Sequence, residues 1–90
     1  MNRAEAKAIA KAVCAEWQAR RYADVVPLVG ELEVLERIGP SGVAYQVEIN
    51  IVWDDRANGP IRVLVGVDDG RLPAAFRPEA ADCIIEPEAG

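Results

Sequence analysis

The sequence contains no histidine, and this absence removes several functions at once. Histidine is the most common general base near neutral pH, the usual pH switch and the most common metal ligand. The chain also lacks the glycine-rich phosphate loops, the GxSxG nucleophile motif and the Cys/His sets that hold zinc. Catalysis would have to rest on carboxylates alone. We therefore expect a protein that is not an enzyme and that uses no cofactor.

Cysteine and long apolar runs are also scarce. The two cysteines, Cys14 and Cys83, are far apart and form no CxxC motif. This arrangement favours free thiols in a reducing compartment, with a disulfide as the less favoured alternative. No apolar run approaches the ~18 residues of a membrane span. The first residues, MNRAEAKAIAKAV, lack the apolar region of a signal peptide, so we expect a cytoplasmic protein with no membrane segment.

Positive charge is in the minority. Ten Lys and Arg stand against fifteen Asp and Glu, which gives a net charge of −5 and a pI near 4.6. Phosphate backbones are bound by dense Lys and Arg, so we expect no nucleic-acid partner. A basic ridge near the N-terminus is best interpreted as a solvated helix face, and contact with RNA or an acidic partner is the alternative. The ridge consists of Arg3, Lys7, Lys11 and Arg21.

Ninety residues predict a single domain, 1–90, and its first element is a helix. The segment from about Arg3 to Val26 is rich in Ala, Lys, Glu and Arg, which are strong helix formers. Asn2 is a good N-cap, and Pro27 forbids continuation. Apolar residues recur at helical spacing and predict one core-facing stripe, namely Ala6, Ile9, Ala10, Val13, Cys14 and Trp17.

Three strands are predicted after the helix. The first runs from Glu31 to Ile38 and is followed by the turn cluster GPSG. The second, residues 43–53, has the clearest alternation of apolar and polar side chains in the chain. The third runs from Ile61 to Val67, with Arg62, Leu64 and Gly66 on the outward face. The pattern indicates an antiparallel meander with one face on a core.

Loop lengths predict how these strands pair. A four-residue loop at GPSG would set Leu32, Val34 and Ile38 on the core face, opposite Ile49, Val47 and Val43, with Leu35 outward. The same register makes Glu33 and Glu48 cross-strand neighbours. In the second hairpin, a two-residue Asn-Gly turn would mismatch the faces. We therefore predict a wider loop that pairs Trp53 with Ile61 or Val63.

The last twenty residues have no single interpretation. The segments LPAAF and PEAAD, at 72–76 and 78–82, could each form a helical turn after a proline. Residues 83–85 could add a short edge strand. The predicted fold is therefore α+β: a long N-terminal helix packed on one face of a three-stranded antiparallel meander. It carries a short irregular or helical C-terminal piece and a possible fourth edge strand.

One helix cannot cover both faces of a sheet, so the outward face is the first candidate contact surface. Its predicted members are Leu35, Gln46, Glu48, Val52 and Leu64. A second candidate is a face of small side chains on the helix, which would let another helix approach closely. Its members are Ala4, Ala8, Ala12, Ala15 and Ala19. These surfaces predict a homo-oligomer or a protein partner.

Two Asp pairs invite a metal-site interpretation. Asp54-Asp55 and Asp68-Asp69 lie at opposite ends of the third strand, roughly 20 Å apart, and cannot share one ion. We interpret them as turn residues, with a weak divalent-cation site as the alternative. The favoured function is a protein–protein interaction module, such as an adaptor, chaperone-like partner or inhibitor, acting as a homodimer. The alternative is a domain that binds a small ligand or divalent cation through a surface Asp pair.

Overall fold

The first helix carries the apolar stripe that the sequence predicts. The structure is a computed structural model, which describes residues 2–70 and 78–88. Helix α1 spans Arg3–Gln18 and begins where the Asn2 side chain accepts a hydrogen bond from the Glu5 N–H at 3.0 Å. No described helix is both long and apolar enough to cross a membrane. The buried residues of α1 all lie on one stripe: Ala6, Ala10, Val13, Cys14 and Trp17.

The prediction of one helix as far as Val26 is wrong. The chain turns after Gln18, and a short helix α2 (Tyr22–Val25) and a 3₁₀ turn η1 (Val26–Leu28) follow. At 3.6 residues per turn, an unbroken helix would place Asp24 almost directly below Trp17, on the core side. A carboxylate there would be buried without a partner. The turn exposes Asp24 and buries Val25 in its place.

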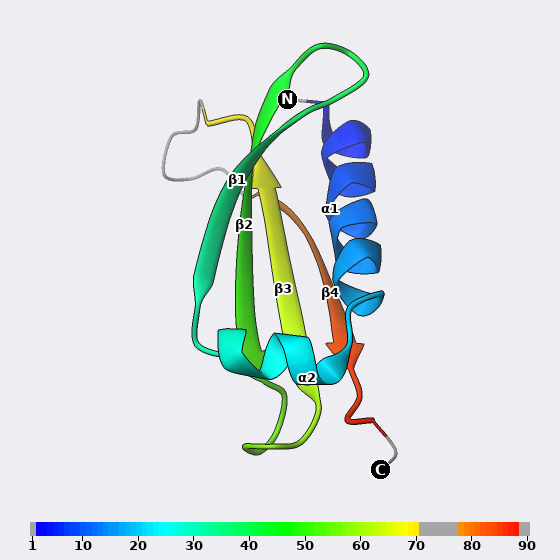
Figure 1. Ribbon diagram of the computed structural model, residues 1–90. Coiled ribbons are helices and arrows are strands. Elements are labelled where there is room, and N and C mark those ends of the chain that lie inside the picture. Colours follow the sequence, from blue (N-terminus) through cyan, green and yellow to red (C-terminus); the bar gives the residue numbers. More distant parts are fainter. Residues whose placement is uncertain (1, 71–77, 89–90) are drawn as a thin grey trace.

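The strands form one antiparallel sheet in the order β1-β2-β3-β4 (Figure 1). Their bounds are β1 Leu32–Ile38, β2 Ala44–Trp53, β3 Ile61–Asp68 and β4 Glu79–Ile85. The α+β fold with a fourth edge strand is thus confirmed. The helical turn suggested for residues 78–82 is wrong, because most of that segment belongs to β4. The turn suggested for 72–76 lies outside the described residues.

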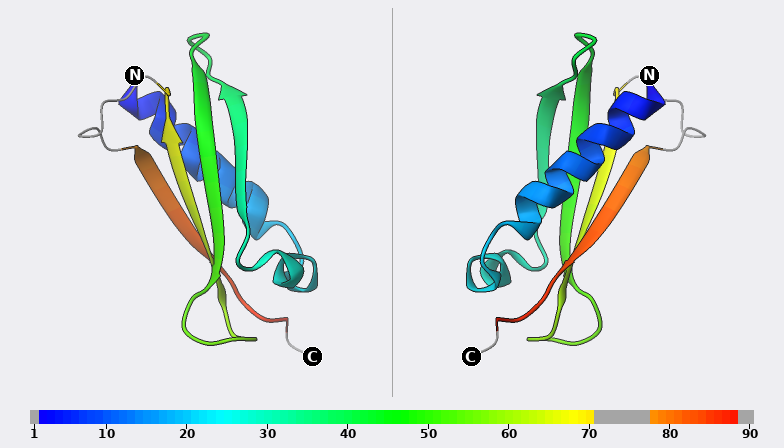
Figure 2. Two further views of the ribbon diagram at one scale, coloured as in Figure 1. Left: turned by 90° about the vertical axis from the view of Figure 1, so that its left-hand side faces the viewer. Right: turned by 90° about the vertical axis from the view of Figure 1, so that its right-hand side faces the viewer.

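The described helices cover only one face of the sheet. Helix α1 lies across β3 and β4 on the inner face, and the opposite view shows four strands with no described helix in front of them (Figure 2). The core between helix and sheet contains Trp17 and the inward residues of the two central strands. These are Tyr45, Val47, Ile49, Ile51, Ile61, Val63, Val65 and Val67. The opposite, outer face therefore remains uncovered by any described element.

The second hairpin has the wide loop that the sequence predicts. Trp53 pairs with Ile61, which keeps the inward faces of β2 and β3 together. The Asp54 N–H donates to the Pro60 carbonyl at 2.9 Å and closes the loop. Within it Asn58 adopts a positive φ of 66°, a conformation that Asn tolerates better than most residues.

The first hairpin differs from the prediction by one residue. The connection between β1 and β2 has five residues, 39–43, and Gly42 takes a positive φ of 88° in it. A one-residue shift moves every side chain of β1 to the other face. Leu35 therefore lies opposite Val47 on the inner face. Leu32, Val34 and Ile38 lie on the outer face, opposite Asn50, Glu48 and Ala44.

Candidate interaction surface

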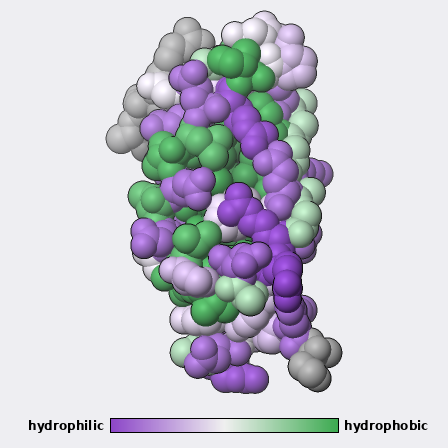
Figure 3. Space-filling model, in the orientation of Figure 1, coloured by the Kyte–Doolittle hydropathy of each residue, from purple (hydrophilic) through white to green (hydrophobic). Residues whose placement is uncertain are grey.

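The outer face carries every large hydrophobic side chain that is strongly exposed in the described chain. The exposed fractions are 56% for Leu32, 49% for Val34, 64% for Ile38 and 40% for Leu64. Three of these lie on β1, and Leu64 lies on β3. Figure 3 shows hydrophobic side chains gathered on the β1 and β2 side of the molecule. Apolar area of this kind is stabilised by contact with another apolar surface.

The structure places most of the predicted surface residues where they were expected. Gln46, Glu48, Val52 and Leu64 lie on the outer face. Leu35 was expected there and instead lies half-buried on the inner face, because the first hairpin loop has five residues. The same error concealed Leu32, Val34 and Ile38, which contribute the most exposed apolar area. The glycine and proline content of GPSGV was the only signal for the longer loop.

The charge on the outer face is mainly acidic. Its carboxylates are Glu36, Glu48, Asp68 and Asp82, and its one described basic residue is Arg62. Arg62 is already engaged, because its Nε donates to Asp54 at 2.7 Å and its Nη1 pairs with Asp82. These carboxylates raise the pKa of Arg62, with the hydrogen bond to Asp54 as the main cause. Glu48 forms no hydrogen bond or ion pair with any described residue.

Two shallow hollows mark this side of the sheet. One, of about 300 Å³, lies over Gly66 between Glu48 and Asp82. The other, of about 440 Å³, lies beside Tyr45 near the first hairpin and has Val34 and Gln46 on its rim. Both are open to solvent, so neither confines an acid–base pair away from water.

The structure does not bring together the carboxylates that the sequence suggested as acting in pairs. Glu33 and Glu48 were expected to be neighbours, but the observed register puts them on opposite faces of the sheet. Asp54 pairs with Arg62, and the Asp68 side chain accepts the Gly70 N–H at 2.7 Å, which is ordinary turn bonding. The two Asp pairs lie at opposite ends of β3. Within residues 2–70 and 78–88, no cluster of three or more metal-ligating side chains occurs.

The two cysteines meet inside the core. The Cys83 thiol of β4 lies 3.5 Å from the Cys14 carbonyl of α1, and both residues are buried and free. Burial, followed by the neighbouring Cys14, raises the pKa of Cys83 to about 12. Burial likewise raises the pKa of Cys14. Thiols with raised pKa values are poor nucleophiles at neutral pH, so this pair packs the interface between helix and sheet.

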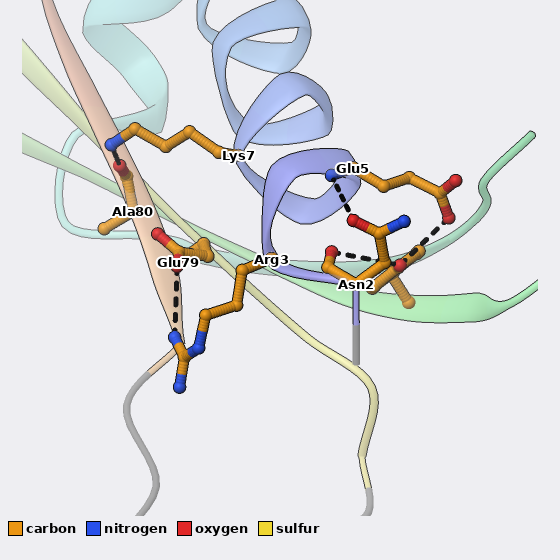
Figure 4. A network of polar contacts seen from close by, with 7 residues as sticks. Asn2, Arg3, Glu5, Lys7, Glu79 and Ala80 are labelled. Atoms are coloured by element: carbon orange, nitrogen blue, oxygen red, sulfur yellow. Dashed lines mark hydrogen bonds and ion pairs between the residues drawn. The ribbon is translucent and has the colours of Figure 1, made fainter.

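The small side chains predicted as a second contact surface lie on the solvent side of α1. These five alanines are all exposed on α1 or at its C-cap: Ala4, Ala8, Ala12, Ala15 and Ala19. The basic ridge beside them is largely occupied within the chain. Arg3 pairs with Glu79 at 3.0 Å and Lys7 donates to the Ala80 carbonyl (Figure 4). Arg21 pairs with Glu88.

Comparison with known proteins does not identify the function of this surface. No protein-family model, no curated protein and no solved structure matches the chain. Any function must therefore be argued from the residues themselves.

Proposed function

We propose that this protein is a non-catalytic protein–protein interaction module of the cytoplasm that acts as a homodimer, in the manner of an adaptor, a chaperone-like partner or an inhibitor. One observation carries the proposal: four large hydrophobic side chains are exposed together on the uncovered outer face. The contact surface lies on this side of the sheet, at β1, its most apolar strand.

The composition of β1 supports a contact at this side of the sheet. A strand with one solvated face normally alternates between apolar inward and polar outward residues. In β1 the outward positions are Leu32, Val34, Glu36 and Ile38, so three of four are apolar. Removing apolar area from water contributes about 25 cal/mol per Å². Contact at this side of the sheet would remove part of that area from water, and a second copy of the chain offers the same apolar residues.

The acidic charge of the outer face restricts which protein segments a dimer could bind there. Glu48 and Asp82 flank the hollow over Gly66. A protein segment with apolar and basic side chains would fill the hollow and pair with these carboxylates. We expect such a segment rather than an acidic one, because like charges facing each other oppose binding.

The test compares one substitution on the sheet side with one on the alanine face of α1. V34E and A8E each place one glutamate at an exposed position. Light scattering on a sizing column measures the mass of each. We expect wild type and A8E at about twice the 9.7 kDa of one chain, and V34E at the mass of one chain. Matching circular dichroism spectra would show that both variants fold.

Two outcomes would overturn the proposal. Wild-type protein that stays at the mass of one chain at every concentration is not a homodimer. If A8E is monomeric while V34E remains dimeric, the alanine face and not the sheet is the contact surface.

A further inference from the structure

The two edges of the sheet differ in how much the rest of the described chain covers them. At the β4 edge, side chains of α1 reach two strand carbonyls: Lys7 donates to the Ala80 carbonyl, and Gln18 donates to the Ile84 carbonyl at 3.2 Å. Figure 4 shows the first of these contacts beside the ion pair of Arg3 with Glu79. The helix therefore already occupies this edge, and a further strand would have to displace its side chains.

The β1 edge has no such cover among the described residues. The Gly39 N–H donates to the Val43 carbonyl, and the Ile51 N–H donates to the Glu31 carbonyl. These bonds place the odd-numbered residues of β1 in hydrogen-bonded pairs with β2. Because antiparallel pairing alternates, the main-chain groups of residues 32, 34, 36 and 38 point away from β2. No described residue bonds to them.

β1 has few of the features that keep another strand away from a sheet edge. Sheet edges are usually protected by proline, charged side chains, a bulge or a covering segment. The inward charges of β1, Glu33 and Arg37, have opposite signs, so they can pair with those of another β1. The strand LEVLERI has no proline or lysine, and its pairing with β2 runs without a bulge from Leu32 to Ile38. Its outward side chains are mostly apolar. An edge with free main-chain groups and exposed apolar side chains is the part of this sheet best suited to strand addition.

We propose that β1 pairs antiparallel with β1 of a second copy about a two-fold axis at Leu35, forming one continuous eight-stranded sheet. This inference rests on the proposed homodimer and names its interface. Only registers that join even-numbered residues to even-numbered residues use the free main-chain groups and keep the faces aligned. Among these, the register centred on Leu35 pairs the whole strand Leu32–Ile38 with itself.

The side chains of β1 are self-complementary in this register. Leu32 lies opposite Ile38 of the second copy, and Leu35 lies opposite its own equivalent. Glu33 lies opposite Arg37 of the second copy, and by symmetry Arg37 lies opposite its Glu33, so two Glu–Arg ion pairs form across the seam. Arg37 already pairs with Glu16 at 2.6 Å, and its five N–H donors can serve both carboxylates. A register centred on Glu36 would instead set two glutamates against each other.

Edge pairing also suits the charge and apolar pattern of the outer face. Stacking two copies outer face on outer face would bring the carboxylates of both together, against one described arginine, Arg62, from each. Edge pairing avoids that contact. It places the two β1 strands at the centre of the sheet, so that Leu32, Val34 and Ile38 of both copies form one apolar strip. A protein partner would then find a single continuous surface.

The test exchanges charge at the two paired positions. E33R sets two arginines against each other at each seam contact, and R37E sets two glutamates against each other. Each variant alone should dimerise about tenfold more weakly than wild type, or worse, as measured by analytical ultracentrifugation. An equimolar mixture should recover wild-type dimerisation as a heterodimer, because the two arginines of E33R face the two glutamates of R37E.

L64E and E48R are matched controls on the outer face away from the edge, and both should remain dimers. R37E also loses the ion pair with Glu16, so its melting temperature is measured first to check that it folds. Glu33 forms no ion pair within the described chain, so E33R should not lower the stability of the monomer. Dimeric E33R with monomeric L64E would overturn edge pairing and leave the homodimer intact. Weak singles with no recovery on mixing would overturn the register. Monomeric wild type would remove the proposed function itself.

Discussion

At the scale of single residues, Glu5 holds the first hairpin against the start of α1. Its carboxylate accepts hydrogen bonds from the Ser41 hydroxyl at 2.6 Å, the Ser41 N–H at 3.1 Å and the Tyr45 hydroxyl at 2.9 Å. The Ser41 hydroxyl is the main cause that lowers the pKa of Glu5 below its ordinary value of 4.5. Burial, and then the bond to Glu5, raises the pKa of Tyr45.

This geometry predicts how stability depends on pH. A carboxylate whose pKa is lower in the folded state stabilises the fold above its unfolded pKa, and the contribution is lost as pH falls through the folded pKa. E5Q should therefore have a lower melting temperature than wild type at pH 7. The difference should shrink below about pH 4.5, as Glu5 becomes protonated in both states. Calorimetric scans across this range measure it.

E48Q is the control for this experiment, because Glu48 forms no bond with a described residue. Its offset from wild type should stay small at every pH. A difference between E5Q and wild type that does not change with pH would contradict a role for the charged form of Glu5.

At the scale of elements, the sequence predicted the central strands because their patterns are unambiguous. Residues 45, 47, 49 and 51 of β2 are apolar and buried, and the residues between them are mostly polar. In β1 both faces are partly apolar, since Val34 and Leu35 are neighbours. The face then depends on one residue of loop length, which hydrophobic alternation does not contain. This is why the placement of Leu35 was wrong while Gln46, Glu48, Val52 and Leu64 were placed correctly.

The end of α1 was missed for a different reason. Residues 19–21, Ala-Arg-Arg, are good helix formers, so local propensity favours continuation. The break follows from tertiary packing, which cannot bury Asp24. The sequence did contain a sign of this, because the apolar stripe stops at Trp17. In β4, the segment EAAD lacks β-branched residues, and pairing with β3 determines its structure instead.

Replacing two glycines, one in a strand and one in a turn, should change the free energy of unfolding in opposite directions. Gly66 lies inside β3 without a positive φ, and a Cβ there would meet no atom within 4 Å. G66A should stabilise the protein by about 0.5–1 kcal/mol, because glycine loses more entropy than alanine in a strand. Gly42 has a φ of 88°, so G42A should destabilise it by about 1–2 kcal/mol through backbone strain. Urea unfolding measures both changes.

The contrast between these two variants is the informative result. If G66A destabilises the protein as much as G42A does, the hollow over Gly66 is not the open space that the structure describes.

At the scale of the whole molecule, the described chain has one face covered by a helix and one sheet edge, at β1, that no described residue covers. The α+β class and the uncovered face followed from the sequence, because a single helix cannot cover both sides of a sheet. The free β1 edge did not, since it depends on which strands are terminal and on the contacts that α1 makes with β4. In the proposed homodimer the β1 edge would form the seam, and the two outer faces would form the surface that the dimer presents.

Disulfide trapping of L35C tests this account most directly. Leu35 lies on the proposed two-fold axis, in a pair whose Cα atoms would be about 4.5 Å apart, which is within disulfide range. The native thiols are buried, with raised pKa values, and should not compete. Oxidised glutathione should therefore convert L35C to a covalent dimer of about twice 9.7 kDa on a non-reducing gel. V34C, whose thiol would face Glu36 of the second copy, should cross-link far less. L35C that stays at the mass of one chain, or cross-links no faster than V34C, would contradict the β1 pairing.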